Sequence, residues 1–405
     1  MTRAPKWSCA QPLDSPDDSP LLANAKRGSL GARLLVWLLV ASAVSCSHQR
    51  RHELVSTLAG DRTCGLDSTR AQTMLGFMRR FPNESEVSVA ILTDDSTSFF
   101  GVKRRNDSLI CVDNKAGVFE IGSVTKTFTA TILAKMVRDG AVELQAPIQR
   151  FLPIALHQSS LNGKEVTLLQ LANHTSGLPK EPDNIGADLT VPGSPYRDYD
   201  ESKLYDYLSK RMTLQSTPGE RREYSNLGGG LLGHLLALIA GKPYEDLLRE
   251  TICEPLGLQS TFVALSSDRM RHLVPGRDPN GRVIPNWELN VLAGGGGMKS
   301  TAEDMAKYVR ACINDTTFYL LTQQPTIWYT EHNAAGLGWA WYADGNRKYV
   351  SATGGTGGYS CCVIFERSRR TGIVVLTNVS AFLASKNDDI VKLSRALGDP
   401  LIAAR

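Results

Sequence analysis

Apolar and polar residues alternate in two regions, one near residue 90 and one after Gly336. Residues 87–91 have the two-residue period of a half-buried strand, and Asp94-Asp95 then turns the chain toward a second strand at 99–102. Past Gly336 the alternation predicts four more strands, at 337–342, 348–352, 359–365 and 372–377. The pattern therefore predicts antiparallel strands at both ends of the chain.

The middle of the chain has helical periodicity instead. From 123 to 139 apolar residues recur every three or four positions and Gly140 follows as a C-cap, which predicts a helix packed on the sheet. Residues 227–240 are apolar on nearly every face, which predicts a buried helix. Capping residues mark three more helices: Thr167 with Gln170, Ser300 with Glu303, and Asn387 or Asp388 before a helix that ends at Leu397, ahead of Gly398 and Pro400.

This order of elements predicts an α+β fold. The simplest arrangement joins both ends of the chain in one antiparallel sheet flanked by helices, a three-layer α/β/α domain built from residues 47–150 and 330–405. Residues 151–329 then form an inserted all-α subdomain, so that 47–405 is one folded unit. We expect a ligand cleft between the two parts.

The first 46 residues resemble a leader. Basic residues precede an apolar run at 34–44, which has the length of a secretory signal and is too short to span a bilayer. Residues 43–46 also look like a lipoprotein cleavage site, which would attach the chain to a membrane through Cys46; ordinary cleavage after Cys46 is the alternative. We therefore expect an exported protein, either periplasmic or anchored to a membrane.

Composition and charge exclude several classes of partner. The net charge of +4 and the 42% of hydrophobic residues are ordinary for a soluble protein, so nucleic-acid binding is not expected. The chain has no Cys-x-x-Cys or His-Glu-x-x-His motif, so we expect no metal ion and no cofactor. Cys361 and Cys362, if they lie on a strand, point to opposite faces and are expected in the core.

Ser123-Val124-Thr125-Lys126 is the first segment that could carry chemistry. Residues three apart share one face of a helix, so the Lys126 amine can reach the Ser123 hydroxyl. A serine at a helix N-terminus also lies where backbone N–H groups favour a developing anion, which helps to activate a weak nucleophile. The alternative interpretation is an N-cap serine followed by a solvated lysine.

Two later segments are candidate partners for this serine. Tyr224-Ser225-Asn226 could supply a general base, because a tyrosine can act as a base only if a cation such as Lys126 lowers its pKa from about 10; a simple turn is the alternative. The glycine-rich run 352–358 falls between two predicted strands. Such a run leaves backbone N–H groups free for an oxyanion hole, unless it is only a flexible hairpin loop.

These three segments, in this order, resemble the penicilloyl serine hydrolases, which include class C β-lactamases, low-molecular-mass D,D-peptidases and related esterases. The resemblance covers roughly residues 119–378 and implies a β-lactamase/transpeptidase-like fold. Other segments that match the family pattern are residues 173–179, Pro218-Gly219, residues 294–298, residues 300–304 and Gly336-Leu337-Gly338-Trp339.

The resemblance also implies roles for individual residues. Ser123 would attack a carbonyl carbon to form an acyl-enzyme, and Lys126 and Tyr224 would take its proton and pass it to the leaving atom. No metal or cofactor is implied. The remaining implied roles are orientation of the acyl amide by Asn226, substrate binding by Thr353 and Gly354, and an oxyanion hole made by the backbone N–H groups of Ser123 and Gly355.

Ala352 departs from the family pattern, which has lysine or sometimes histidine before Thr-Gly. Without that cation a charge-assisted hydrogen bond to a substrate carboxylate is lost, about 1.5 to 3 kcal/mol or roughly ten- to a hundredfold in binding. The leading hypothesis is an exported serine hydrolase of peptidoglycan peptides that end in D-amino acids, or of β-lactams. An esterase or amidase of small neutral acyl substrates is the alternative, and a non-turnover penicillin-binding sensor or scaffold is the third.

Overall fold

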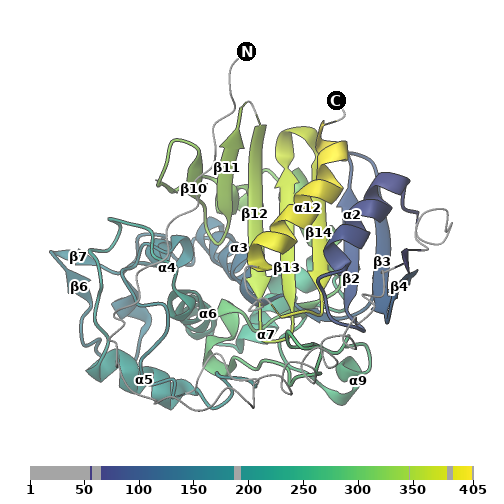
Figure 1. Cartoon of the computed structure of the whole chain (residues 1–405). Helices are drawn as coiled ribbons and strands as arrows, with labels where there is room; N and C mark the ends of the chain where they lie inside the picture. The colour runs from purple at the N-terminus through teal and green to yellow at the C-terminus, as the bar shows by residue number, and fades with distance from the viewer. Residues whose placement is uncertain (1–54, 57–64, 187–192, 346, 381–385, 404–405) are drawn as a thin grey trace, which may run out of the picture. The chain divides into compact units, whose positions relative to one another are not determined.

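Strands from both ends of the chain form one sheet. The computed structural model describes residues 55–56, 65–186, 193–345, 347–380 and 386–403. Figure 1 shows early strands (blue) beside late ones (yellow), and all neighbouring pairs are antiparallel except the first. In this described part the sheet has ten strands, in the spatial order β1 (Val55–Ser56), β4 (Ser108–Cys111), β3 (Thr97–Arg105), β2 (Glu86–Leu92), β14 (Thr371–Thr377), β13 (Ser360–Glu366), β12 (Arg347–Gly355), β11 (Ala340–Asp344), β10 (Asn333–Ala335) and β9 (Ile327–Trp328).

Helices and short strands make up the other regular elements. The α-helices are α2 (Ser68–Met78), α3 (Thr125–Arg138), α4 (Leu168–Asn173), α5 (Glu201–Lys210), α6 (Asn226–Ala240), α7 (Tyr244–Leu248), α8 (Glu254–Leu256), α9 (Ser267–Met270), α10 (Ala302–Asn314), α11 (Phe318–Gln323) and α12 (Lys386–Ala403). Shorter helical turns are η1 (Gly122–Val124), η2 (Ile148–Phe151), η3 (Arg249–Cys253), η4 (Asn290–Gly295) and η5 (Arg367–Arg369). Two strand pairs lie outside the sheet, β5 (Phe119–Glu120) with β8 (Lys299–Ser300) and β6 (Ser160–Leu161) with β7 (Lys164–Glu165).

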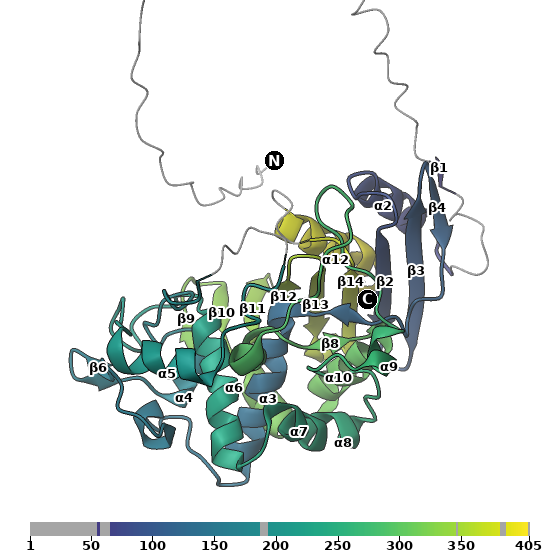
Figure 2. The same ribbon diagram turned by 90° about the horizontal axis from the view of Figure 1, so that it is seen from below.

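The sheet lies between two layers of helices. On one face Val89 packs in a core with Met74 of α2 and residues of α12. On the other face Ala90 packs in a second core with Phe128 of α3 and Val309 of α10. Figure 2 shows α2 and α12 on one side of the sheet and α3 and α10 on the other. This arrangement confirms the three-layer α+β fold.

Most of the regular elements in the region 151–329 are helices, but the region also carries β6, β7, β8 and β9, and β9 belongs to the main sheet. In addition α10, which lies in this region of the sequence, contacts β2 and β14. Its amphipathic pattern places Met305 and Val309 in the core, because an apolar stripe must be covered by another apolar surface. Helix α10 therefore covers the sheet, although its residues belong to the stretch that we expected to form the inserted subdomain.

The main predicted elements are confirmed. The hairpin at 87–102 is β2 and β3, and the predicted helices at 123–139 and 227–240 correspond to η1 with α3 and to α6. Gln170 Oε1 accepts a hydrogen bond from the Thr167 backbone N–H at 2.8 Å, as the capping-box spacing predicts. Cys361 and Cys362 lie on β13 and are buried in the two different cores.

The predicted boundaries of three elements are wrong. The N-cap of α10 is Thr301, whose Oγ1 accepts from Asp304 N at 3.1 Å, because Ser300 belongs to β8. Strand β11 begins only at Ala340, because residues 336–338 turn toward α4, where Gly338 N donates to a backbone carbonyl. Helix α12 begins at Lys386, so Asn387 and Asp388 lie inside it and do not cap it. It continues past residues 398 and 400 to Ala403, since the packing of its buried face outweighs the local stop signals.

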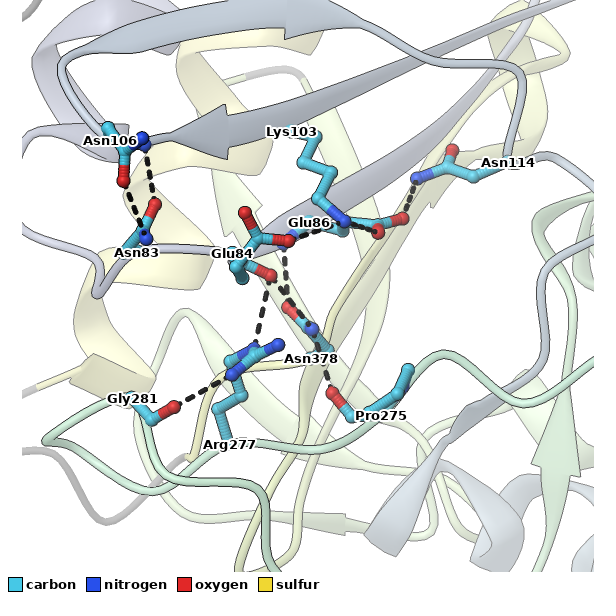
Figure 3. A network of polar contacts seen from close by, with 10 residues as sticks. All are labelled: Asn83, Glu84, Glu86, Lys103, Asn106, Asn114, Pro275, Arg277, Gly281 and Asn378. Atoms are coloured by element: carbon cyan, nitrogen blue, oxygen red, sulfur yellow. Dashed lines mark hydrogen bonds and ion pairs between the residues drawn. The ribbon is translucent and has the colours of Figure 1, made fainter.

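A polar network joins the start of β2 to the loop at 275–284. The buried Asn378 accepts from the Glu86 backbone N–H at 2.6 Å and donates to the Pro275 carbonyl at 2.8 Å. Arg277 N donates to the carbonyl of Gly358, so the loop also holds the turn that follows β12. Figure 3 shows this network, which fixes a loop of the helical region to the end of the sheet.

Lys103 of β3 completes the network. Its Nζ forms ion pairs with Glu84 Oε2 at 2.8 Å and with Glu86 Oε1 at 3.1 Å (Figure 3). The hydrogen bond from Lys103 lowers the pKa of Glu84. Asn114 Nδ2 donates to the second carboxylate oxygen of Glu86 at 3.2 Å, so this carboxylate has partners on both oxygens.

The predicted leader, residues 1–46 with Cys46, lies outside the described residues. Among the residues that are described, no helix combines the length and the apolar character needed to cross a membrane. Cys111 is disulfide-bonded, whereas Cys253 and Cys312 are buried free thiols.

Candidate active site

Ser123 lies in η1, directly before α3, where the chain meets the end of β12. Gly122 has a φ of 48°, and a Cβ there would lie 2.5 Å from the backbone nitrogen of Gly355. A Cβ at Gly354 would lie 1.9 Å from the carbonyl oxygen of Ile121. Glycine at both positions therefore lets β12 lie directly against the turn that carries the serine.

Lys126 lies on the first turn of α3 with a side chain that is only 5% exposed. Its Nζ lies 3.0 Å from Ser123 Oγ, as the three-residue spacing predicts. The same nitrogen contacts Tyr224 OH at 2.8 Å, Asn226 Oδ1 at 2.8 Å and the carbonyl oxygen of Gly295 at 2.5 Å. The lysine is therefore buried among four oxygen atoms.

Tyr224, Ser225 and Asn226 form the start of α6. Ser225 is the N-cap, and its Oγ accepts from Gly228 N at 2.8 Å. Tyr224 precedes the cap and remains 37% exposed, with its OH 2.5 Å from Ser123 Oγ. The N-termini of α3 and α6 thus bring the predicted nucleophile, lysine, tyrosine and asparagine together.

The glycines of α6 make room for this arrangement. A Cβ at Gly229 would lie 2.7 Å from Lys126 Cε, and one at Gly230 would lie 2.7 Å from the side chain of Leu292 in η4. Glycine is unfavourable inside a helix, so its presence here requires a packing reason. That reason is the lysine side chain and the close approach of η4, which supplies the Gly295 carbonyl.

Glu181 sets the orientation of the Asn226 amide. Its Oε1 accepts from Asn226 Nδ2 at 2.6 Å and from Tyr196 OH at 3.0 Å. A carboxylate oxygen needs a donor, so these bonds turn the nitrogen of the amide toward Glu181 and its oxygen toward Lys126. Burial raises the pKa of Glu181, and its Oε2 is buried without a hydrogen-bond partner in the described part of the chain.

The four oxygens around Lys126 compete for three ammonium protons. Asn226 Oδ1 and the Gly295 carbonyl can only accept, so they take two of the three protons. The third is shared by Tyr224 OH and Ser123 Oγ, whose own separation is 2.5 Å. The serine proton therefore has a direct path to the tyrosine oxygen.

His174 packs against Tyr224 from the loop after α4. Their ring centroids are 4.5 Å apart, and His174 Nδ1 accepts from the Ser225 backbone N–H at 3.3 Å. Burial, and then the charges of Lys126 and Arg222, hold the pKa of His174 well below its usual value of 6.5. The ring is therefore neutral at neutral pH.

A pocket of about 90 Å³ lies beside the serine. Its lining includes Ser123, Lys126 and Tyr224 on one side and Ala352 and Thr353 of β12 on the other. The side chain of Thr353 is exposed, whereas the small side chain at 352 brings no charge to the pocket. A larger cavity of about 570 Å³ lies further along α6 and contains none of the predicted site residues.

The structure brings four of the predicted site residues together around Lys126 and places Gly354 apart from them. Lys126 contacts Ser123, Tyr224 and Asn226, and Ser123 also contacts Tyr224, while Gly354 is covered by the backbone of Ile121. The catalytic roles of the four, the substrate contacts of Thr353 and Gly354, and the oxyanion hole at Gly355 stay predictions.

Sequence reasoning missed Glu181 and Arg222. Each lies close to a recognised segment, Glu181 two residues after Pro179 and Arg222 two residues before Tyr224. This proximity was the available signal, but it did not reveal which side chains point into the site. Within the described ranges, no group of three His, Cys, Asp or Glu side chains is placed to hold a metal ion.

Comparison with known proteins shows which proteins this chain resembles. The family model described as Beta-lactamase matches residues 81–395. The D-alanyl-D-alanine-carboxypeptidase/endopeptidase AmpH of Escherichia coli (strain K12) is 31% identical over 290 residues, 67% of this chain and 73% of that protein. A beta-lactamase of Pseudomonas fluorescens is 28% identical over 336 residues, 72% of this chain and 88% of that protein.

A solved structure has the same fold. The class C beta lactamase from Rhodobacter sphaeroides superimposes with a TM-score of 0.67 at 25% identity, covering 83% of this chain and 100% of that one. The matched region includes all the residues that surround Lys126, from Ser123 to Gly295. By its sequence and by its fold, the chain belongs to the Beta-lactamase family.

Proposed function

We propose that this protein is an exported serine acyl-transfer hydrolase that cleaves D-Ala-D-Ala-type peptides or β-lactams through an acyl-enzyme. One observation carries the proposal: Ser123 Oγ lies 2.5 Å from Tyr224 OH and 3.0 Å from Lys126 Nζ. An unactivated serine is a weak nucleophile, and a tyrosine that acts as a phenolate beside a lysine ammonium can accept its proton. The names of the relatives, a D-alanyl-D-alanine-carboxypeptidase/endopeptidase and a beta-lactamase, support the substrate class.

In the first half-reaction Ser123 Oγ bonds to the substrate carbonyl carbon. In this step Tyr224 acts as a phenolate, stabilised by the Lys126 ammonium beside it, and its oxygen takes the serine proton over their short contact. The oxyanion would be held by the backbone N–H groups of Ser123 and Gly355, which Gly122 allows to come close. The bond from the carbonyl carbon to the leaving nitrogen or oxygen then breaks, and the leaving atom takes the proton from Tyr224.

Water completes the cycle in the same way. It gives a proton to Tyr224 as its oxygen bonds to the acyl carbon, and Ser123 Oγ then leaves and regains a proton. Asn226 keeps one amide N–H on Glu181 and has a second one to donate to a carbonyl of the acyl group. The same residues therefore serve both half-reactions.

Ala352 favours a second candidate, an esterase or amidase of small neutral acyl substrates. The side chain at this position lines the pocket beside Ser123 and carries no charge for a substrate carboxylate. A neutral substrate needs no cation at this position. Its acyl group would be transferred to Ser123 by the same steps, with a different leaving group.

The test compares three substrates on the purified protein: a fluorescent penicillin, a D-Ala-D-Ala peptide and p-nitrophenyl acetate. We expect Ser123→Ala to abolish both labelling and turnover, and Ser98→Ala, a change at an exposed position of β3, to leave them intact. Undiminished turnover in Ser123→Ala contradicts the proposal. Ester turnover without reaction of penicillin or peptide identifies the esterase, and label that forms but is never released identifies a sensor.

Export rests on the leader sequence at residues 1–46. Expression of the full chain in a bacterium, followed by N-terminal sequencing of the product, is expected to give cleavage at or after Cys46. Metabolic labelling with a fatty acid distinguishes the two options, because only a lipoprotein loses the label in Cys46→Ala. An uncleaved chain in the cytoplasm contradicts export.

A further inference from the structure

Arg222 carries a charge that no residue in the described part of the chain neutralises. It lies two residues before Tyr224 and lines the pocket beside Ser123. Its guanidinium has no ion pair or hydrogen bond with the described residues, and its Nε is buried without an acceptor. The neighbouring Arg221 differs, because it is exposed and forms an ion pair with Glu223 at 2.9 Å.

The guanidinium of Arg222 has a defined position although it forms no ion pair or hydrogen bond with the described residues. Its Cζ lies 5.4 Å from the ring centroid of Tyr329, a distance at which a cation and an aromatic face attract. The backbone next to Arg222 is also held, since Glu223 N donates to the carbonyl of His174 at 2.7 Å. Arg222 is therefore presented to the pocket by the fold.

The pocket has the electrostatic character of an anion site. Its lining includes the two cations Arg222 and Lys126 and contains no aspartate or glutamate. Trp339, which lines the same pocket, has a buried indole N–H without a hydrogen-bond partner among the described residues. Arg222 is half-buried, and its buried Nε has no acceptor among the described residues. The fork of N–H groups on an arginine matches a carboxylate.

We propose that Arg222 determines substrate specificity by binding a carboxylate on the leaving group, the charge that Ala352 cannot hold. Tyr224 must come within hydrogen-bond reach of the leaving atom to return the proton, and Arg222 lines the same pocket. The part of the substrate that contacts Arg222 is therefore the leaving group. This inference rests on the proposed acyl transfer at Ser123 and names the class of leaving group that the site prefers.

The test uses two esters that differ only in charge, 3-carboxyphenyl acetate and 3-carbamoylphenyl acetate. We expect Arg222→Gln to lower kcat/KM for the carboxylate ester by about 10- to 100-fold and for the amide ester by less than about threefold. Arg222→Lys keeps the cation without the fork, so an intermediate loss is expected. Adding Ala352→Lys to Arg222→Gln is expected to restore the preference for the carboxylate ester.

Arg221→Gln is the matched control, and it is expected to change neither ester by more than about twofold. Equal losses on both esters, or an unchanged carboxylate ester in a folded Arg222→Gln, overturn the proposal. If the unmodified protein hydrolyses neither ester, the proposed acyl transfer fails by itself. In that case calorimetry measures the binding of the two esters to Ser123→Ala, with and without Arg222→Gln. A loss of affinity confined to the carboxylate ester supports the role of Arg222, and equal losses or no loss overturn it.

Discussion

Glu181 accepts a hydrogen bond from the Asn226 amide at 2.6 Å, and this contact turns the amide oxygen of Asn226 toward Lys126. In Glu181→Ala the amide is free to rotate and to place an N–H group against the ammonium. We expect kcat/KM for p-nitrophenyl acetate to fall by about tenfold, the worth of one charge-assisted hydrogen bond. Glu220→Gln, at an exposed position of the segment before α6, is the control, and an equal loss in both variants contradicts a positioning role for Glu181.

Gly229→Ala is expected to separate stability from activity. Alanine stabilises an ordinary helix interior by about 0.5 to 1 kcal/mol, but a Cβ at this position would lie 2.7 Å from Lys126 Cε. The displaced amine loses its alignment with Ser123 and Tyr224, so we expect kcat to fall by about 100-fold.

Gly76→Ala in α2 is the control for this effect, because a Cβ there meets no atom within 4 Å. It is expected to raise the free energy of unfolding in urea by about 0.5 to 1 kcal/mol without a change in kcat. If Gly229→Ala retains full activity, the glycine has no role in placing the lysine.

His174 makes the folded state sensitive to acid. Its folded-state pKa lies well below the usual 6.5, so the stability it contributes is present above pH 6.5 and is lost as the pH falls toward the lowered value. We expect the unfolding free energy to fall by up to about 1.4 kcal/mol per pH unit below pH 6.5. In His174→Asn, which can keep the left-handed backbone at this position, this part of the slope is expected to disappear.

The measurement for His174 is urea unfolding of both proteins between pH 7.5 and 5. Only the difference in slope is informative, since the variant also loses the ring contact with Tyr224 at every pH. Other groups, such as His234 with its pKa lowered by burial, contribute equally to both proteins. Parallel pH dependences show that His174 is not the acid-sensitive group.

Asn378→Ala is expected to destabilise the protein by about 1 to 3 kcal/mol. The substitution leaves the Glu86 N–H and the Pro275 carbonyl, both now satisfied by one buried side chain, without a partner (Figure 3). Asn83→Ala is the matched control, because Asn83 is exposed and its lost contacts with Asn106 are replaced by water. Thermal or urea unfolding that gives the same cost for both variants rules out the network as a source of stability.

Local patterns in the sequence determined the elements of this fold. The alternation of apolar and polar residues over a few positions was enough to predict β2, β3 and the last strands. Successive side chains of a strand point to opposite faces of the sheet, so the pattern that predicts a strand lies within the strand itself. The contact between Ser123 and Lys126 followed from helical spacing alone, since residues three apart share a face. The order of the recognised segments also indicated the family.

Contacts between distant parts of the chain were decided only by the tertiary structure. Glu181 and Arg222 gave no periodic signal, and their importance comes from the placement of the loop after α4 and the segment before α6 around one pocket. The sequence showed that Ala352 lacks a charge, whereas the fold placed the guanidinium of Arg222, which pairs with no described residue, in the same pocket. The physical reason is that charge pairing and side-chain packing act through space, and local sequence does not specify which distant residues they join.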